Sequence, residues 1–306
     1  MASPPTLPNQ PLSPPSSTCV RVPAPSESPR RISTLNPVLG TAVGSDPFLE
    51  KLRHRTFANA CDILMELHSG EELRDDDDFG QPIRIKSPEG LGMNVPDEFT
   101  SFKDKETVMG EVGSTFPEVD VIDVGAQETK SMPIDMFLDR FFGIVPSPTP
   151  LNCLSLEVTN TTMGEKIQSP RFVRSLEWKK KLDHNSSTRS DVGKYFILSM
   201  ENSYTDFHVD FGGSSVWYHI VKGAKIFYFV APTVKNLSLF ERWQRLHNQR
   251  ETFFGDMVDK CYKLELEENE TLIIPTGWIH GVLTTRKSVV YGGNFLNSLN
   301  IPLQIK

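Results

Sequence analysis

Long apolar runs are absent from this chain, and none approaches the roughly 20 residues that a membrane-spanning helix needs, so we expect no membrane association. The N-terminus lacks the basic-then-apolar pattern of a signal peptide. Cysteine is scarce, and its four residues form no CxxC pair, which makes a structural zinc finger improbable. This cysteine pattern fits an intracellular, reducing compartment best. The formation of one disulfide bond remains as an alternative.

Positive charge is also in deficit, because 32 Lys and Arg stand against 39 Asp and Glu and the formal net charge is −7. This balance argues against non-specific DNA binding and is compatible with a basic peptide substrate. The acidic run at residues 75–78 is expected on a loop, where it serves either solubility or the attraction of such a peptide.

Residues 1–47 hold eleven of the 23 prolines, many serines and almost no aromatic residues. Such a segment buries too little apolar surface to offset its ordering entropy, so we predict a disordered Pro/Ser-rich tail. Residues 48–306 are predicted to form the folded part, with a core at about residues 150–306 and an N-terminal helical and β elaboration. No internal repeat is evident.

Apolar spacing and turn residues predict the individual elements. Helices are expected at 48–66, 132–142, 172–182 and 234–248, and strands at 83–85, 119–124, 151–158 and 194–200. From residue 194 onward, short strands recur between turn signals, which is typical of a β-sandwich or barrel. The fold class predicted is therefore mostly β with flanking helices.

A His and an Asp two residues apart, His208 and Asp210, point to the same side of an extended chain. One more imidazole completes the two-histidine, one-carboxylate set that leaves open positions on iron(II), and His280 is the candidate. The alternative is that His208 and Asp210 are ordinary exposed residues that bind no metal, and that His280 is unrelated to them.

Residues 216–221 and 224–230 are expected to pair as a hairpin around Lys222-Gly223. Tyr218 and Lys225 would then lie diagonally on one face. A lysine among Ile, Phe and Tyr needs an anionic partner. That partner is either a protein carboxylate or the distal carboxylate of a dicarboxylate cosubstrate.

The segments YTDFHVDFGGSSVWYHIVKGAKIFYFVAPT, FFGDMVDKCYK, LIIPTGWIHGV and GGNFLNSLNIPLQIK resemble the JmjC domain of 2-oxoglutarate-dependent histone lysine demethylases. They are most similar to the subfamily that carries a plant homeodomain finger ahead of JmjC, with weaker similarity from about residue 48. The resemblance implies a double-stranded β-helix, a jelly-roll or cupin-like barrel.

The resemblance also implies roles for particular residues. His208, Asp210 and His280 would be the iron(II) ligands and catalytic centre. Thr205 and Lys225 would hold 2-oxoglutarate, assisted by Tyr218. Asn152 and Asn294 would line the cosubstrate and methyl-lysine pocket. Thr205 and His208 differ in strand parity, so a bend or bulge is required between them.

The activity implied is removal of methyl groups from mono- and dimethyl-lysine of histone H3, at the ninth and twenty-seventh positions, with O2 consumed and formaldehyde released in the nucleus. Alternatives are demethylation of the position-thirty-six lysine, a JmjC protein hydroxylase, and a catalytically silent chromatin scaffold.

The tail has no Cys/His set for a plant homeodomain finger, so a separate chromatin-reader partner is expected unless recruitment differs. Direct sequence-specific DNA binding is not expected. The chain ends where relatives continue into helices, as in a fragment or a shortened paralogue.

Overall fold

The computed structural model describes residues 41–74, 79–97, 102–177 and 193–304, which contain a sheet of 12 strands. The strands are β1 (Ala58–Asn59), β2 (Met65–Ser69), β3 (Ile83–Ser87), β4 (Glu118–Asp123), β5 (Glu128–Pro133), β6 (Leu151–Glu157), β7 (Tyr195–Ser199), β8 (Tyr204–His208), β9 (Ser215–Val230), β10 (Tyr262–Leu266), β11 (Thr271–Ile274) and β12 (Ile279–Phe295). The α-helices are α1 (Asp46–Arg53), α3 (Lys105–Val108), α4 (Ile134–Phe141), α5 (Thr162–Lys166), α6 (Arg171–Leu176), α8 (Val234–Gln244) and α9 (Ile301–Gln304).

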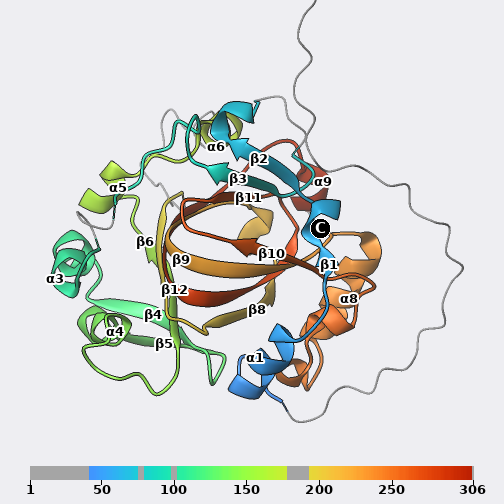
Figure 1. The fold of residues 1–306 in the computed structure, drawn as a ribbon, viewed down its shortest axis with the longest axis horizontal. Helices are drawn as coiled ribbons and strands as arrows, with labels where there is room; N and C mark the ends of the chain where they lie inside the picture. Colours follow the sequence, from blue (N-terminus) through green and yellow to red (C-terminus); the bar gives the residue numbers. More distant parts are fainter. Residues whose placement is uncertain (1–40, 75–78, 98–101, 178–192, 305–306) are drawn as a thin grey trace, which may run out of the picture. The chain divides into compact units, whose positions relative to one another are not determined.

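Two long antiparallel strands, β9 and β12, form the frame of the sheet. Their pairing runs from Val230 opposite Ile279 to Ser215 opposite Phe295. Beside β9, β11 pairs with its first half and β10 with its second half, while β7 and β8 pair with β12. In Figure 1 these strands curve around a common interior. The predicted mostly β, jelly-roll architecture with flanking helices is confirmed.

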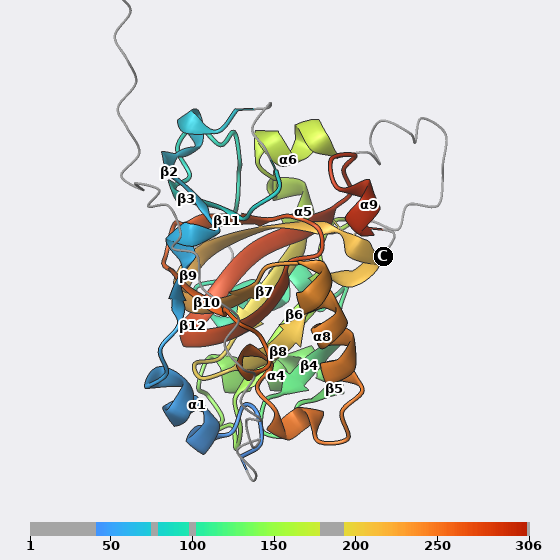
Figure 2. The ribbon, with the colours of Figure 1, turned by 90° about the vertical axis from the view of Figure 1, so that its right-hand side faces the viewer.

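The outer helices pack on the sheet through apolar stripes. In α4 the buried residues recur at helical spacing: Ile134, Phe137, Leu138 and Phe141. In α8 the Oγ1 of Thr233 accepts a hydrogen bond from the Asn236 amide at the N-terminus, and Phe240 and Trp243 are buried. Figures 1 and 2 show β2, β3 and α6 toward one end of the barrel and α1 toward the other.

Alternation along β9 divides its side chains between the barrel interior and an outer core. Phe227 and Phe229 belong to one buried cluster with Tyr218, whereas Tyr228 and Val230 belong to another, which contains side chains of α1 and α8. A third cluster joins β3, β4, α4 and β6. Apolar packing therefore surrounds the barrel on its outer side.

Most predicted elements are confirmed within a few residues. The strands at 83–85, 119–124, 151–158 and 194–200 correspond to β3, β4, β6 and β7, and the helix at 132–142 corresponds to α4. The strand β5 was not predicted, since its side chains are mostly exposed and carry no alternating pattern. Residues 1–40 of the predicted tail and the acidic run at 75–78 lie outside the described residues, and α1 already begins at Asp46.

The helix predicted at 48–66 is wrong beyond Arg53. After α1 the chain enters β1, where Ala58 pairs in parallel with Tyr262 and its amide donates to the Cys261 carbonyl over 2.9 Å. Residues 65–69 then form β2 beside β3. Apolar spacing at 57–64 fits a helix, but pairing with distant strands satisfies the backbone instead.

The hairpin predicted around Lys222-Gly223 is also wrong, because β9 continues through this point without reversing. Gly223 has φ +92° and an added Cβ would lie 2.3 Å from the Lys287 carbonyl oxygen, so the glycine serves a close approach to β12. Opposite it, the register with β12 shifts between Arg286 and Val289. The irregularity changes which residues face inward in the two halves of β9.

Two other predicted helices differ in extent. The helix predicted at 234–248 ends at Gln244, and the chain then turns back so that the Thr252 carbonyl accepts from the Trp243 indole over 2.8 Å. The helix predicted at 172–182 corresponds to α6, and residues 178–182 lie outside the described residues.

Candidate metal centre and cavity

Three side chains from two paired strands converge at one point. His208 ends β8, Asp210 follows it by two residues, and His280 lies opposite His208 on β12. One potential ligand atom from each lies within 4.8 Å of the other two. The two imidazole centroids are 4.3 Å apart, and Nε2 of His280 is 3.9 Å from a carboxylate oxygen of Asp210. The predicted ligand set is therefore brought together.

Backbone carbonyls orient both imidazoles. Nδ1 of His208 is 2.9 Å from the Asp206 carbonyl oxygen, and Nδ1 of His280 is 3.0 Å from the Trp278 carbonyl oxygen. A carbonyl only accepts, so each Nδ1 donates and each Nε2 keeps its lone pair. This is the tautomer that a metal requires, held by the outer hydrogen bonds that metal-binding histidines use.

Burial keeps His280 uncharged. Its imidazole is 4% exposed, and burial together with the neighbouring His208 lowers the pKa of His280 to about 4, although Asp210 acts in the opposite direction. A neutral imidazole and a carboxylate suit a divalent cation. Such a cation would be attracted to the Nε2 lone pairs of both His208 and His280. The donor set fits iron(II).

The required irregularity before the ligands is present as a β-bulge. Across β8 and β12, His208 faces His280 and Thr205 faces Val282, and the register shifts between these pairs. Two residues of β8, Asp206 and Phe207, therefore stand against Gly281 alone. The bulge places the side chains of Thr205 and His208 on the same side, and the predicted bend is confirmed.

A cavity of about 430 Å³ opens onto this centre. All eight residues singled out from the sequence line it: Asn152, Thr205, His208, Asp210, Tyr218, Lys225, His280 and Asn294. Much of the remaining wall is apolar and comes from the barrel interior, including Ile197, Phe227 and Val282. The cavity thus combines convergent polar groups with apolar walls, as ligand sites generally do.

Among the described residues that line this cavity, Lys225 is the one lysine or arginine, and it is 1% exposed. Its Nζ donates to Oγ of Ser199 over 2.7 Å and to Oγ1 of Thr284 over 2.9 Å. Burial lowers the pKa of Lys225 to about 7. Among the described residues no carboxylate forms an ion pair with it, which counts against the protein-carboxylate alternative. An ammonium with only hydroxyl partners fits an anionic ligand.

Hydrogen bonds link Lys225 to the metal side of the cavity. Oγ of Ser199 donates to the Asn152 side-chain oxygen over 2.7 Å, and the Asn152 amide donates to Oγ1 of Thr205 over 2.9 Å. The Tyr218 ring stands edge-on to Phe227 with centroids 5.3 Å apart. Because β9 bends at Gly223, the two rings meet inside the barrel without the predicted hairpin.

Ser199 and Thr284, which accept hydrogen bonds from Lys225, were not predicted as site residues. Neither were three other residues that line the cavity, Tyr195, Gly292 and Gly293. A signal for Thr284 existed, since it has the same strand parity as His280. Ser199 ends a predicted strand, but nothing local relates it to Lys225. Asn294 was identified, and its amide donates to Oγ of Ser214 over 2.8 Å.

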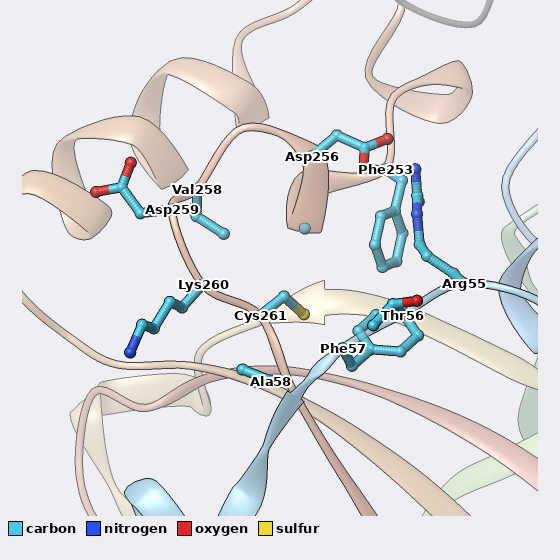
Figure 3. A pocket seen from close by; sticks show the side chains of 11 residues that line it. Arg55, Thr56, Phe57, Ala58, Phe253, Asp256, Val258, Asp259, Lys260 and Cys261 are labelled. Carbon is cyan, nitrogen blue, oxygen red and sulfur yellow. Dashed lines mark ion pairs between the residues drawn. The ribbon is translucent and has the colours of Figure 1, made fainter. Parts of the chain in front are cut away.

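A second, smaller cavity of about 180 Å³ lies between residues 55–58 and 253–261, away from the eight residues (Figure 3). Its charges are largely compensated, because Arg55 pairs with Asp256 at 2.5 Å and Lys235 pairs with Asp259 at 2.5 Å. The Arg55 guanidinium also lies 4.7 Å from the centroid of Phe253. These contacts pair Arg55, Asp256 and Asp259 within the protein.

Fold and centre together define a jelly-roll protein with a candidate metal site of two histidines and one carboxylate. Residues 195–295 match the JmjC family, described as "JmjC domain, hydroxylase", and this range holds all three candidate ligands and Lys225. This part of the chain is therefore similar to a JmjC domain, as the sequence motifs predict. Within the part of the chain that the structure describes, no helix has the length and apolar character needed to cross a bilayer.

Relatives extend the similarity beyond that domain. The chain is 42% identical over 268 residues to "Histone lysine demethylase PHF8" of Danio rerio, covering 86% of this chain and 26% of the relative. It is 40% identical over 268 residues to "Lysine-specific demethylase 7B" of Danio rerio, covering 86% and 46%. It is 35% identical over 270 residues to "Lysine-specific demethylase 2A" of Xenopus tropicalis, covering 82% and 22%. The chain spans less than half of each relative.

Proposed function

We propose that this chain is an Fe(II)/2-oxoglutarate-dependent dioxygenase that removes methyl groups from mono- and dimethyl-lysine of histone H3, at the ninth and twenty-seventh positions. One observation supports the proposal most strongly: the same cavity is lined by the buried Lys225 and by the cluster of His208, Asp210 and His280. The name of one relative supports a histone lysine substrate, and that of another supports a lysine substrate. The proposed place of action is nuclear chromatin, with the H3 tail as partner and a separate reader protein for targeting.

Each group has a distinct task in this proposal. His208, Asp210 and His280 would hold iron(II), with the two Nε2 lone pairs directed by the carbonyls of Asp206 and Trp278. When bound, iron(II) and 2-oxoglutarate supply the oxidation by O2 that converts an N-methyl group into formaldehyde and leaves the amine, with succinate and CO2 as co-products. The protein supplies binding, orientation and shielding.

The closed part of the cavity would take the cosubstrate. The Lys225 ammonium would bind its distal carboxylate with Thr205 and Tyr218 beside it, while Ser199 and Asn152 hold these groups in place. The apolar walls, including Ile197, Phe227 and Val282, would exclude water from the reacting groups. Asn294 would line the side from which methyl-lysine approaches.

A formaldehyde-release assay tests the proposal, using H3 peptides methylated at positions nine, twenty-seven or thirty-six, with iron(II) and 2-oxoglutarate supplied. Loss of methyl groups from the mono- and dimethyl peptides at nine and twenty-seven is expected by mass spectrometry. Turnover confined to position thirty-six would transfer the activity to that lysine. A stable gain of oxygen without methyl loss would make the protein a hydroxylase. Absence of turnover on every peptide would leave a chromatin scaffold.

A further inference from the structure

The β-bulge in β8 brings two side chains with different proposed roles into the same cavity, Thr205 for the cosubstrate and His208 for the metal. Thr205 and His208 are three residues apart, and in a regular strand their side chains would face opposite sides. The two-against-one arrangement of Asp206 and Phe207 opposite Gly281 removes this conflict. A cosubstrate group and a metal ligand therefore share one face only while the bulge keeps its conformation.

Asp206 contacts the bulge through both its carboxylate and its carbonyl. Oδ1 accepts from the Phe207 amide over 2.8 Å and from the Tyr204 hydroxyl over 3.3 Å. Oδ2 lies 3.5 Å from Nε2 of Gln249. The carbonyl accepts from Nδ1 of His208 over 2.9 Å, so one residue clamps the bulged amide and orients a ligand ring.

The surroundings of Asp206 show that its carboxylate is not there to form an ion pair. Among the described residues no lysine, arginine or histidine side chain is paired with it, and the side chain does not line the cavity. An unpaired carboxylate in a half-buried place costs free energy unless hydrogen bonds repay it. The hydrogen bonds from the Phe207 amide and the Tyr204 hydroxyl offset part of this cost.

The packing around the bulge leaves little room for another arrangement. Tyr204 is fully buried with its ring 5.1 Å from that of Phe48, and the Phe207 ring lies 5.3 Å from that of Phe253. On the partner strand, a Cβ added to Gly281 would lie 3.2 Å from the Tyr204 hydroxyl and 3.4 Å from the Thr205 carbonyl. The bulge therefore packs closely against β12, and the Asp206 carboxylate stabilises it through the hydrogen bond from the Phe207 amide.

We propose that Asp206 is a positioning residue of the metal centre: its carboxylate holds the bulge that puts Thr205 and His208 on one face, and its carbonyl directs Nε2 of His208 toward the metal. The inference rests on the proposed function, because it assumes that His208 is a ligand. It adds a residue outside the cavity whose effect reaches the metal through backbone geometry.

The test uses the full chain and cobalt(II) as a spectroscopic probe of the metal site, so no turnover is needed. Wild type, Asp206→Ala, Asp206→Asn and Asp206→Glu are titrated, with Asp259→Ala as the control at a carboxylate that is 79% exposed. Loss of an outer-shell partner typically weakens metal binding about 10- to 100-fold. We expect a weakening of this order, with an altered cobalt(II) visible spectrum, for Asp206→Ala.

The Asp206→Asn and Asp206→Glu variants distinguish the position of the side-chain acceptor from its charge. Asn keeps an acceptor at the Oδ1 position and should bind cobalt(II) within about threefold of wild type, whereas Glu keeps the charge but is one methylene too long and should bind as weakly as Ala. This contrast keeps the test valid if the Ala variant does not fold. Binding within twofold of wild type for folded Ala or Glu variants would overturn the role of Asp206.

Failure of the proposed function has a different signature. If the metal site is correct, His208→Ala loses cobalt(II) binding while Asp259→Ala retains it. If wild type and His208→Ala bind cobalt(II) alike, His208 is not a ligand, and both the metal site and the inference about Asp206 are rejected. If His208→Ala loses the metal and the Asp206 variants do not, only the inference fails.

Discussion

Nζ of Lys225 donates to Oγ of Ser199 over 2.7 Å at a point where the lysine is 1% exposed and the serine 0%. The same serine hydroxyl donates to Asn152, so it connects the buried cation with the amide that contacts Thr205. A hydroxyl that accepts from one residue and donates to another fixes the position of both, and we propose that both residues serve cosubstrate binding.

Ser199→Ala should therefore weaken 2-oxoglutarate binding without removing it. The substitution removes the hydroxyl that accepts from Lys225 and donates to Asn152, and a loss of about 0.5–1.5 kcal/mol in cosubstrate binding corresponds to a rise of about two- to twelvefold in the cosubstrate KM. Ser199→Thr keeps the hydroxyl and should recover most of the affinity. Steady-state kinetics at saturating peptide measure the effect, and an unchanged KM in Ser199→Ala would remove the serine from cosubstrate binding.

Lys225→Ala should have a larger effect in the same direction. A hydrogen bond to a charged group contributes about 1.5–3 kcal/mol, so the 2-oxoglutarate requirement should rise about 10- to 150-fold. Lys235→Ala is the control, because that side chain is 58% exposed and pairs with Asp259 on the surface. If no concentration of 2-oxoglutarate restores activity to Lys225→Ala, its role as the carboxylate partner is wrong.

Binding of 2-oxoglutarate should depend on pH through Lys225. Burial lowers the pKa of Lys225 to about 7, and the distal carboxylate favours the ammonium form, so a bound diacid raises this pKa. Above pH 7 binding must then be accompanied by proton uptake, and affinity should fall by up to about tenfold per pH unit, whereas below pH 7 it should level off.

Calorimetry in buffers of different ionisation enthalpy measures that proton uptake on protein loaded with manganese(II). Lys225→Met removes the titrating group, so it should bind 2-oxoglutarate weakly and with no pH dependence between pH 7 and 9. The same uptake in wild type and Lys225→Met would assign it to another group.

His208→Ala and Asp210→Ala should each abolish 2-oxoglutarate turnover while the fold survives. Both residues lie at the end of β8, outside the large apolar clusters, and neither substitution creates a cavity in them. Turnover is followed by succinate formation and folding by thermal unfolding. Turnover that persists in the double variant would mean that the metal is bound elsewhere.

Arg84→Ala should lower stability without affecting the cavity. Nη2 of Arg84 lies 2.7 Å from a Glu270 carboxylate oxygen, and the two side chains are 18% and 10% exposed. Removing one partner of a largely buried pair leaves the other uncompensated and costs about 3 kcal/mol. Denaturant unfolding should show this loss with the 2-oxoglutarate KM unchanged, and a free energy of unfolding equal to wild type would contradict it.

Local sequence patterns singled out part of the candidate site, and the resemblance to JmjC domains supplied the rest, including Thr205, Asn152 and Asn294. His208 and Asp210 follow from period-2 alternation over two residues, and Lys225 stands out as a cation among apolar strand residues. These signals depend on a few neighbouring residues, so they survive any arrangement of the strands. The confirmed strands β3, β4, β6 and β7 rest on the same short-range patterns.

Only the tertiary structure decided how these segments combine. The Lys222-Gly223 signal fits a hairpin locally, yet pairing with the whole length of β12 makes β9 one bent strand. Residues 57–64 fit a helix locally, yet pairing with β10 draws residues 58–59 into the sheet. Ser199 and Asp206 became visible only through contacts with the folded strands, because hydrogen bonding between distant segments outweighs the small differences in local propensity.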